Sequence, residues 1–523
     1  MDVKTVWDEY ERGLDFNNSI DLNDTVEVNE NFFIGKQWEG VQSNGLPTPV
    51  FNFLKRVTLF QVASVTTDNI KMQARPLGYK DLSQAASVVN KEFESLFEHN
   101  KIGMLLREYM RNAAVDGDGC LYTFWDPDLE TGQAAKGGIV TEIVENTRVF
   151  FGNPKSRRVN GQPYIIISTR EVVDDVKKRA EDKENIRPDK DIRTETGLPS
   201  DNLVTVLLRL WKEDGKIWAY ECTQEAVVRK KWDTKLTRYP ITWLNWDYIQ
   251  DCYHGQAMIT GLIPNQIFIN KLFAMSMLSL MTTAYPKIIY DKTKVKNWDS
   301  RVGAAIGVVG GDMNNVARIM DPAQISPQIS QFIELAINYT QTFLGATSAA
   351  MGDTRPDNTS AIIALQRAAA VPSELTKQNL YQSIEDLGRI YIDFMAANYG
   401  VRTVGVNEFG MEELFDFGQL RDEPMSLKLD VGASAYWSEI ASMQTLDNLL
   451  MQGQIQLVDY LERVPDGYIA KKEELIQKIN QMQQPTPQPT GGGIVPGSQE
   501  SINEQPVTAG YGTLQRALQN SVQ

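Results

Sequence analysis

The chain has 523 residues, of which 42% are hydrophobic and 23% are charged, and this composition excludes disorder of the whole chain. At about 150 residues per domain, the length predicts three or four structural units. Acidic residues outnumber basic residues by 67 to 52, which gives a formal net charge of −15. Phosphate neutralisation needs Lys and Arg, so this balance excludes tight DNA binding over the whole surface.

The cysteines and the hydropathy pattern exclude further classes. Cys120, Cys222 and Cys252 are far apart and odd in number, which fits neither a disulfide framework nor a zinc site. The charged N-terminal segment predicts a helix around Trp7 and lacks the apolar core of a signal peptide. The most apolar stretch, 272–284, is shorter than the roughly 20 residues that a membrane-spanning helix needs. The sequence therefore predicts no export signal and no transmembrane segment.

The first half of the chain predicts a mixed α+β domain. Residues 50–112 have a helical pattern of apolar residues, and from Cys120 to about residue 250 the pattern changes to strands. Asp214-Gly215 supplies the positive φ of a tight turn and predicts a hairpin between 203–208 and 217–220. The other predicted strands are 121–125, 148–151 and 164–167.

Two long helices and an insertion follow. A helix is predicted over 264–284, with apolar residues around nearly its whole circumference, so it needs neighbours on several sides. A second, amphipathic helix is predicted after Ser326 as N-cap and Pro327 at the first helical position, and it ends before Gly345. The insertion between them, 285–325, predicts a strand at 287–290. The two helices and the insertion therefore predict a stalk with a tip.

The rest of the chain is again mainly helical. A polar loop, 351–358, precedes a small-residue helix capped by Thr359-Ser360, and a separate long helix is predicted from Pro372 to Gly400. Residues 401–435 predict strands that return to the earlier sheet. Residues 436–482 predict helices with a break at Gly453. The tail after Gln483 is rich in Pro, Gln and Gly, which predicts a flexible segment.

Catalytic and metal-binding patterns are weak. The sequence contains no G-x-x-x-x-G-K-[ST] phosphate loop. Its two histidines, His99 and His254, are isolated, and His254 is predicted to pack or to form hydrogen bonds. Asp116-Gly117-Asp118-Gly119 lacks the later ligands of a calcium loop and predicts a turn into a strand. We predict no enzyme activity, no catalytic residue, no metal site and no cofactor.

Several segments resemble the portal proteins of tailed bacteriophages. The first is the segment 31–40, in which an aromatic residue, Gly35 and Gln37-Trp38 resemble a family signature, with Asn52 and Lys55 after it. The others are similar to the start of the portal stem, the tunnel loop and the tunnel helix: Tyr253-His254-Gly255, 262–266, Ile269-Asn270 and Tyr285-Pro286; then Gly352, 358–366 and 386–391. The resemblance covers roughly residues 25–480.

This resemblance implies a portal fold and a division of the chain. The fold would be α+β, with a mixed α/β wing, a two-helix stem, a small α/β clip, a tunnel helix and a helical crown. The implied boundaries are 1–255 for the first part of the wing, 256–284 for stem helix 1, 285–325 for the clip, 326–345 for stem helix 2, 346–371 for the tunnel loop and tunnel helix, 372–435 for the second part of the wing, 436–482 for the crown and 483–523 for the flexible tail.

The resemblance also implies a function and partners. Twelve subunits would form a ring at one capsid vertex, through which viral double-stranded DNA enters and leaves. The implied partners are the terminase ATPase, head-completion adaptor and tail proteins, and the major capsid and scaffold proteins. The implied location is the portal vertex of the virion, with the host cytoplasm during assembly. Twelve chains of negative net charge would repel DNA phosphates and let the duplex slide.

Candidate site residues follow from these assignments. The DNA channel would be lined by residues of the tunnel loop and helix: Asp353, Arg355, Asp357, Asn358 and Arg367. The clip has an excess of basic residues for docking partners, although ordinary solvated lysines explain it equally well. These residues are Lys287, Lys292, Lys294, Lys296, Arg301 and Arg318.

Two other functions stay open on the sequence. A membrane-associated oligomeric pore is suggested by the apolar segment 255–284, and solubility without detergent would count against it. A DNA-processing hydrolase with unrecognised carboxylates would show metal-dependent nuclease activity.

Overall fold

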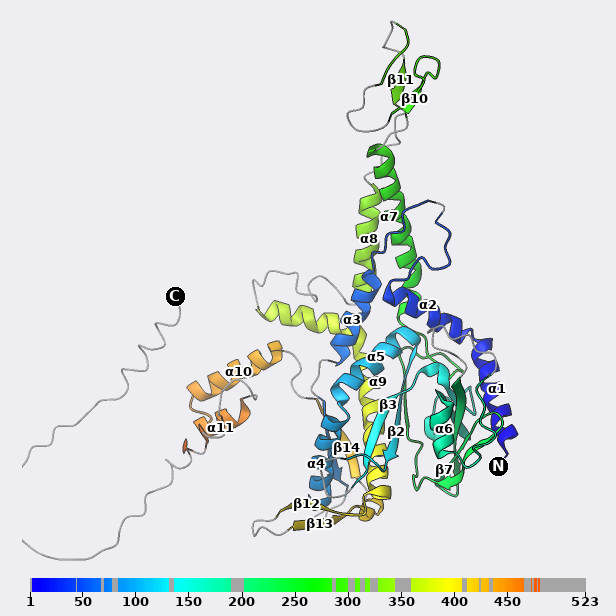
Figure 1. Ribbon diagram of the computed structural model, residues 1–523. Helices are drawn as coiled ribbons and strands as arrows, with labels where there is room; N and C mark the ends of the chain where they lie inside the picture. The colour runs from blue at the N-terminus through cyan, green and yellow to red at the C-terminus, as the bar shows by residue number, and fades with distance from the viewer. Residues whose placement is uncertain are drawn as a thin grey trace, which may run out of the picture. The chain divides into compact units, whose positions relative to one another are not determined.

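The structure is a computed structural model that describes residues 2–43, 45–66, 70–77, 83–130, 136–189, 202–284, 288–299, 306–310, 316–319, 328–343, 359–406, 412–422, 425–431, 436–464, 472, 475, 476, 478 and 479. The chain divides into two compact units, Met1–Glu439 and Ile440–Gln523. The first unit contains the sheets and the long helices (Figure 1). Helices and strands together make an α+β protein, as the sequence predicts.

Five helices occupy most of the first 116 residues. They are α1 (Val3–Ser19), α2 (Leu22–Ile34), α3 (Phe53–Thr66), α4 (Ser83–His99) and α5 (Ile102–Asp116). α2 ends at Gly35, whose φ of 100° is costly for a residue with a Cβ. α5 ends at Gly117, directly before a strand, so Asp116-Gly117-Asp118-Gly119 forms the predicted turn.

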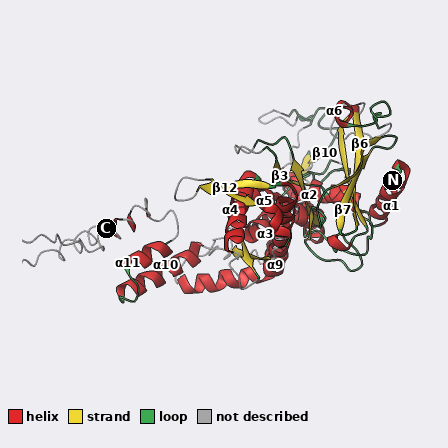
Figure 2. Ribbon diagram, turned by 90° about the horizontal axis from the view of Figure 1, so that it is seen from below, coloured by secondary structure: helices red, strands yellow, loops and turns green. Residues whose placement is uncertain are grey.

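The larger sheet is antiparallel with the order β4-β5-β6-β7-β8. Its strands are β4 (Val149–Phe151), β5 (Tyr164–Val172), β6 (Leu203–Glu213), β7 (Lys216–Cys222) and β8 (Val227–Asp233). Asp214 and Gly215 have φ values of 51° and 79°, which confirms the predicted β6–β7 hairpin. α1 and α6 (Val173–Arg179) lie beside this sheet (Figure 2).

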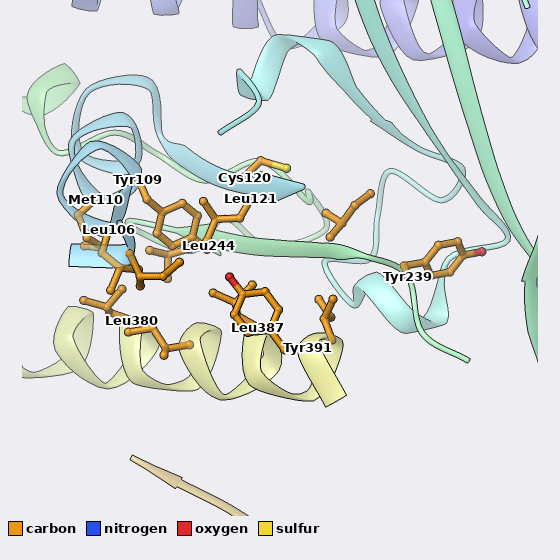
Figure 3. Close-up of a cluster of buried hydrophobic side chains, with 14 of the residues drawn as sticks. Leu106, Tyr109, Met110, Cys120, Leu121, Tyr239, Leu244, Leu380, Leu387 and Tyr391 are labelled. Atoms are coloured by element: carbon orange, nitrogen blue, oxygen red, sulfur yellow. The ribbon is translucent and has the colours of Figure 1, made fainter. Parts of the chain in front are cut away.

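A second, three-stranded sheet has the order β3-β2-β9. Its strands contact α5 and α9. It contains β2 (Asp118–Asp126), β3 (Gly138–Ile143) and β9 (Ile241–Asn245). The main hydrophobic core lies between this sheet, α5 and α9 (Thr359–Asn398), as Figure 3 shows for Tyr109, Leu121, Leu244 and Leu387. The Tyr391 hydroxyl lies 2.8 Å from Thr141 Oγ1, so the ring stays buried with its polar atom satisfied.

The structure corrects the prediction that residues 50–112 are all helical. Ile70–Pro76 forms β1, which pairs with β14 (Met425–Val431) in a separate two-stranded sheet. Residues 401–435 are strand-rich as predicted, but they do not return to the earlier sheet. Instead β12 (Val401–Val406) pairs with β13 (Glu412–Asp416). Met72 and Ala74 alternate into the core, a period of two that overrides the helical pattern nearby.

α9 corrects a second prediction. The predicted start at Thr359 and the end before Gly400 are confirmed, but one 40-residue helix replaces the two separate helices. Pro372 lies inside this helix. Because proline removes a backbone hydrogen bond and crowds the preceding turn, it bends helices. Figure 1 shows that α9 changes direction along its length.

The predicted long helices are present as α7 (Ile263–Ala284) and α8 (Gln328–Phe343), which pack side by side (Figure 1). Ser326, Pro327 and Gly345 lie outside the described residues. The predicted strand in the insertion is β10 (Ile288–Tyr290), which pairs antiparallel with β11 (Ala317–Ile319).

The second unit contains short helices. α10 (Tyr436–Met451) runs into it, and α11 (Leu457–Arg463) follows after the predicted break, where Gly453 has a φ of 69°. The Tyr460 hydroxyl lies 2.7 Å from Asp447 Oδ1 and connects the two helices. The predicted tail after Gln483 lies outside the described residues.

Candidate functional site

The predicted channel residues are largely outside the described residues. Asp353, Arg355, Asp357 and Asn358 belong to that part of the chain, and so do Lys287 and Arg301 of the predicted docking set. Arg367 lies on α9, where its backbone is helical and its side chain is not described. The structure thus places four of the predicted docking residues: Lys292, Lys294, Lys296 and Arg318.

The tip hairpin brings these four residues onto neighbouring segments. Asp291 N donates to Val316 O at 2.9 Å, and Asp291 Oδ1 accepts from Thr293 N at 2.9 Å, which folds a tight turn after β10. The hydrogen bonds from Thr293 lower the pKa of Asp291 and keep it charged. Arg318 stands on β11 opposite Ile289.

The lysines of this turn differ in exposure. Lys292 and Lys296 are exposed, Lys294 is half-buried, and Val295 between them is fully buried. The buried Val295 therefore anchors a turn on which Lys292 and Lys296 are exposed to solvent. None of the described carboxylates forms an ion pair with these three lysines.

The paired long helices α7 and α8 have a packed side and several exposed apolar side chains. Ile269 of α7 packs with Phe53 and Val57 of α3, and Ala336 and Ile337 of α8 pack against this cluster. The remaining surface is unusually apolar for solvent-facing helices. Exposed side chains on α7 are Phe268, Met275, Met277, Leu278, Leu280 and Met281, and those on α8 are Phe332, Leu335 and Tyr339.

A buried polar cluster fixes the first turns of α7 to the loop between α2 and α3. Asn270 Nδ2 donates to Gln37 Oε1 at 2.6 Å, and Gln266 Nε2 donates to Phe51 O at 2.8 Å and to Asn270 Oδ1 at 2.9 Å. Gln37, Gln266 and Asn270 are all buried. Satisfied buried amides of this kind specify one geometry, because each alternative leaves a donor or acceptor unpaired.

Sequence reasoning named these residues only as part of a family pattern and did not assign them a role. Their signal was the polar residues Gln266 and Asn270 at spacing i, i+4 within an otherwise apolar helix, which places both on one side of α7. The partner Gln37 lies 233 residues earlier, so no local pattern could identify it.

A second buried polar cluster surrounds Asp118. Its carboxylate accepts from Gly255 N and from Asn245 Nδ2, each at 2.7 Å, and from Asn146 Nδ2 at 3.2 Å. His254 Nδ1 lies 2.7 Å from the same carboxylate, and His254 Nε2 lies 3.3 Å from Asn17 Oδ1. The prediction that His254 packs and forms hydrogen bonds is therefore confirmed. The cluster connects α1, β2, β9 and the segment that leads into α7.

The described residues also bear on whether the chain has a metal site, a ligand pocket or a membrane-spanning helix. They contain no group of three or more His, Cys, Asp or Glu that could hold a metal ion. A pocket of about 280 Å³ is lined by residues of α3, β1, α4, α5 and α9, and its polar side chains are those of Thr66 and Glu98. No helix in the described part of the chain is both long and apolar enough to cross a membrane.

Residues 171–404 match the family model of the phage P22-like portal protein. The match begins in β5 of the larger sheet, includes α7, α8 and the β10–β11 hairpin, and ends in β12. It confirms the resemblance found in the sequence and supports a phage portal protein. No curated protein matches the chain significantly.

Proposed function

We propose that this chain is the subunit of a portal ring at one vertex of a phage capsid, through which double-stranded DNA is packaged and ejected. The observation that carries the proposal is a two-helix stem with uncovered apolar sides in a segment that matches the P22-like portal family. Portal proteins are structural proteins, and we propose no catalytic role for the chain.

The stem supplies the physical reason for a ring. Burial of apolar surface stabilises an assembly by about 25 cal/mol per Å². Exposed residues such as Met275, Leu280 and Phe332 gain this energy only when another surface covers them. Identical subunits arranged around an axis provide such a surface for every copy, because each subunit covers the next. We propose twelve subunits.

We propose the following parts for the subunit. The wing contains 1–255 and 372–435, the stem contains 256–284 and 326–345, and the clip contains 285–325. The tunnel loop and tunnel helix are 346–371, the crown is 436–482, and 483–523 is a flexible tail.

The channel and the clip have different proposed partners. The tunnel residues Asp353, Arg355, Asp357, Asn358 and Arg367 would contact DNA weakly as it passes. The clip residues Lys287, Lys292, Lys294, Lys296, Arg301 and Arg318 would dock the terminase ATPase and later the head-completion and tail proteins. Support for the clip comes from Lys292 and Lys296, which are exposed and have no ion pair with a described carboxylate. Capsid and scaffold proteins would contact the ring at the vertex.

Imaging and sedimentation of the purified chain test this function. Negative-stain electron microscopy should show annular particles with a central channel, and sedimentation should give a mass of many subunits. A monomer at high concentration in near-physiological buffers, without annular particles, would contradict the proposal. Metal-dependent nuclease activity that Asp-to-Asn changes abolish would support the hydrolase alternative.

A further inference from the structure

The segment 35–52, here called the stem loop, is a closed loop with fixed ends. At its start, Gln37 Oε1 is held by Asn270. At its end, Asn52 Nδ2 donates to Phe33 O at 3.0 Å, which ties residue 52 to the end of α2. Trp38 Nε1 donates to Pro49 O at 2.9 Å and joins the two arms. In the described residues, 35–43 and 45–52, these hydrogen bonds hold both ends and join the two arms.

The stem loop lies against α7. The Phe51 and Phe273 rings stack with centroids 5.1 Å apart, and Gln266 of α7 donates to Phe51 O. Figure 1 shows the loop, in dark blue, extending beyond α7 on the side away from α8. Met277 and Leu280 follow Phe273 at spacings of four and seven residues, so they continue the same side of α7 above the loop.

The part of the stem loop that follows Glu39 presents apolar side chains and carries no charge. Val41, Leu46, Val50 and Phe51 are exposed, with Val41 at 55%. No charged residue occurs from Gly40 to Phe53, whereas 23% of the whole chain is charged. An ordinary solvated loop has no reason to present several apolar side chains without charges between them. Pro47 and Pro49 also limit the freedom that the loop would lose on binding.

The opposite flank of the stem carries a matching surface. Phe332, Leu335 and Tyr339 of α8 recur at the spacing i, i+3, i+7 and form one exposed stripe, here called the α8 stripe. Ile333 and Ile337 lie on the other side of α8, toward the core. Glu334 is the one charged residue of α8. Low charge and aromatic side chains are typical of the centre of a protein interface.

We propose that the stem loop of one subunit covers the α8 stripe of the next subunit. This inference rests on the proposed ring and specifies its contact. The two surfaces lie on different flanks of one stem, so a copy cannot use one patch twice as in a two-fold dimer. A head-to-tail contact between different patches, repeated with a fixed rotation, closes into a ring. The polar cluster of Gln37, Gln266 and Asn270 then has the role of presenting the loop at the interface.

Cross-linking of two chains that each carry one introduced, exposed cysteine, beside the buried Cys120 and Cys222, tests the contact. Both chains carry Cys252→Ser, because Cys252 is the natural cysteine that is not fully buried. One chain carries Leu46→Cys and the other carries Leu335→Cys, with tags of different size. After joint assembly, a short bismaleimide should give the mixed product in high yield. Neither chain alone should give a cross-linked dimer, and neither should the control pair Met104→Cys with Leu335→Cys, because Met104 is exposed on α5.

Removal of the apolar side chains gives an independent measurement. The triple variant Val41→Ser, Leu46→Ser, Val50→Ser should raise the concentration needed for half-assembly by at least about tenfold. The thermal unfolding of the subunit should stay unchanged because these side chains are exposed in the single chain. The matched control, Leu77→Ser, Met104→Ser, Val172→Ser, removes exposed apolar side chains elsewhere and should assemble normally.

The outcomes separate this inference from the proposed function. If no rings form with the natural sequence, the proposed function fails and this inference fails with it. If rings form but the mixed product is absent for cysteines at 41, 46 or 50 against 332, 335 or 339, this inference alone is overturned. Normal assembly of the triple serine variant would also overturn it.

Discussion

His254 Nδ1 lies 2.7 Å from Asp118 Oδ2, although 136 residues separate them in the chain, and both side chains are buried. Asp118 begins β2, and His254 lies in the segment that leads to α7. The pair therefore fixes the start of the stem to the sheet that carries the main core. Buried polar side chains of this kind are stable only when hydrogen-bond partners satisfy them.

Removal of the Asp118 carboxylate should destabilise the subunit strongly. Asp118→Ala removes the acceptor of four hydrogen-bonding groups, of which Asn146 and His254 are buried, and this should lower the free energy of unfolding by about 3–5 kcal/mol. Urea unfolding followed by circular dichroism measures the change. The control is Asp128→Ala, an exposed carboxylate shortly after β2, which should change stability by less than about 0.5 kcal/mol. Equal effects of the two substitutions would contradict the assigned role.

Asp116 should make stability fall as pH rises. Burial, together with the nearby Glu30 carboxylate, raises the pKa of Asp116 to about 8, although Arg111 lies 4.0 Å away. The folded chain then keeps a proton on Asp116 that the unfolded chain releases near pH 4. Between about pH 4 and 8 the unfolded state binds fewer protons, so this group lowers the free energy of unfolding by up to about 1.4 kcal/mol per pH unit.

The substitution Asp116→Asn removes this titration and should flatten the pH profile. Urea unfolding at pH 5 and pH 8 should show a smaller loss of stability for the variant than for the natural chain. Asp128→Asn, which changes an exposed carboxylate, should keep the natural profile. Parallel profiles for the natural chain and Asp116→Asn would show that Asp116 is already ionised in the folded protein.

Local sequence signals predicted elements but not how distant elements pair. Asp214-Gly215 fixed a hairpin because its backbone conformation depends on two adjacent residues. β1 was missed because its partner, β14, lies more than 300 residues later, and only that pairing makes Ile70–Pro76 a strand. Proline predicts a helix boundary at Pro372, whereas α9 continues through this residue. For β1, the long-range pairing overrode the local preference.

For the candidate site too, the sequence predicts the local feature, the apolar helix α7, but not the loop that is anchored to it by distant residues. The apolar circumference of α7 predicted a helix that needs partners, and the exposed residues of the single chain agree with that need. The sequence does not reveal the stem loop as a surface. Its first anchor, Gln37, bonds to Asn270, which is 233 residues away. Its second anchor, Asn52, bonds to the backbone carbonyl of Phe33 near the end of α2, and a backbone acceptor leaves no sequence signal. Apolar residues without charges between Gly40 and Phe53 were the available signal.

Charged substitutions on the stem should prevent ring formation without unfolding the subunit. Met277 and Leu280 are 42% and 64% exposed, so a lysine at either position meets solvent in the single chain. In a ring the same lysines would be buried without a partner, which costs several kcal/mol per subunit. Met277→Lys with Leu280→Lys should therefore shift the protein to monomers in sedimentation, with an unchanged circular dichroism spectrum. Met104→Lys on α5 is the control, and rings from the double variant would contradict the role of this flank.

Charge reversal in the proposed clip should separate the proposed docking role from assembly. Lys292, Lys294 and Lys296 lie on one turn after β10, where Val295 anchors the backbone and the described carboxylates leave them unpaired. Their replacement by Glu keeps the turn, since Asp291 and Thr293 still form it, but reverses the local charge. Like charges facing each other across an interface oppose association, so the terminase ATPase of the same virus should bind the variant ring at least about tenfold more weakly.

Two comparisons make the clip experiment specific. Lys91→Glu, Lys101→Glu and Lys155→Glu together change the net charge by the same amount at exposed positions outside the clip, and this variant should bind the ATPase normally. Binding to the natural ring should weaken as salt concentration rises, because the Debye length falls to about 3 Å at 1 M salt. Annular particles should form from both variants. If the clip variant binds the ATPase as tightly as the natural ring at low salt, the three lysines are ordinary solvated side chains and docking depends on other residues.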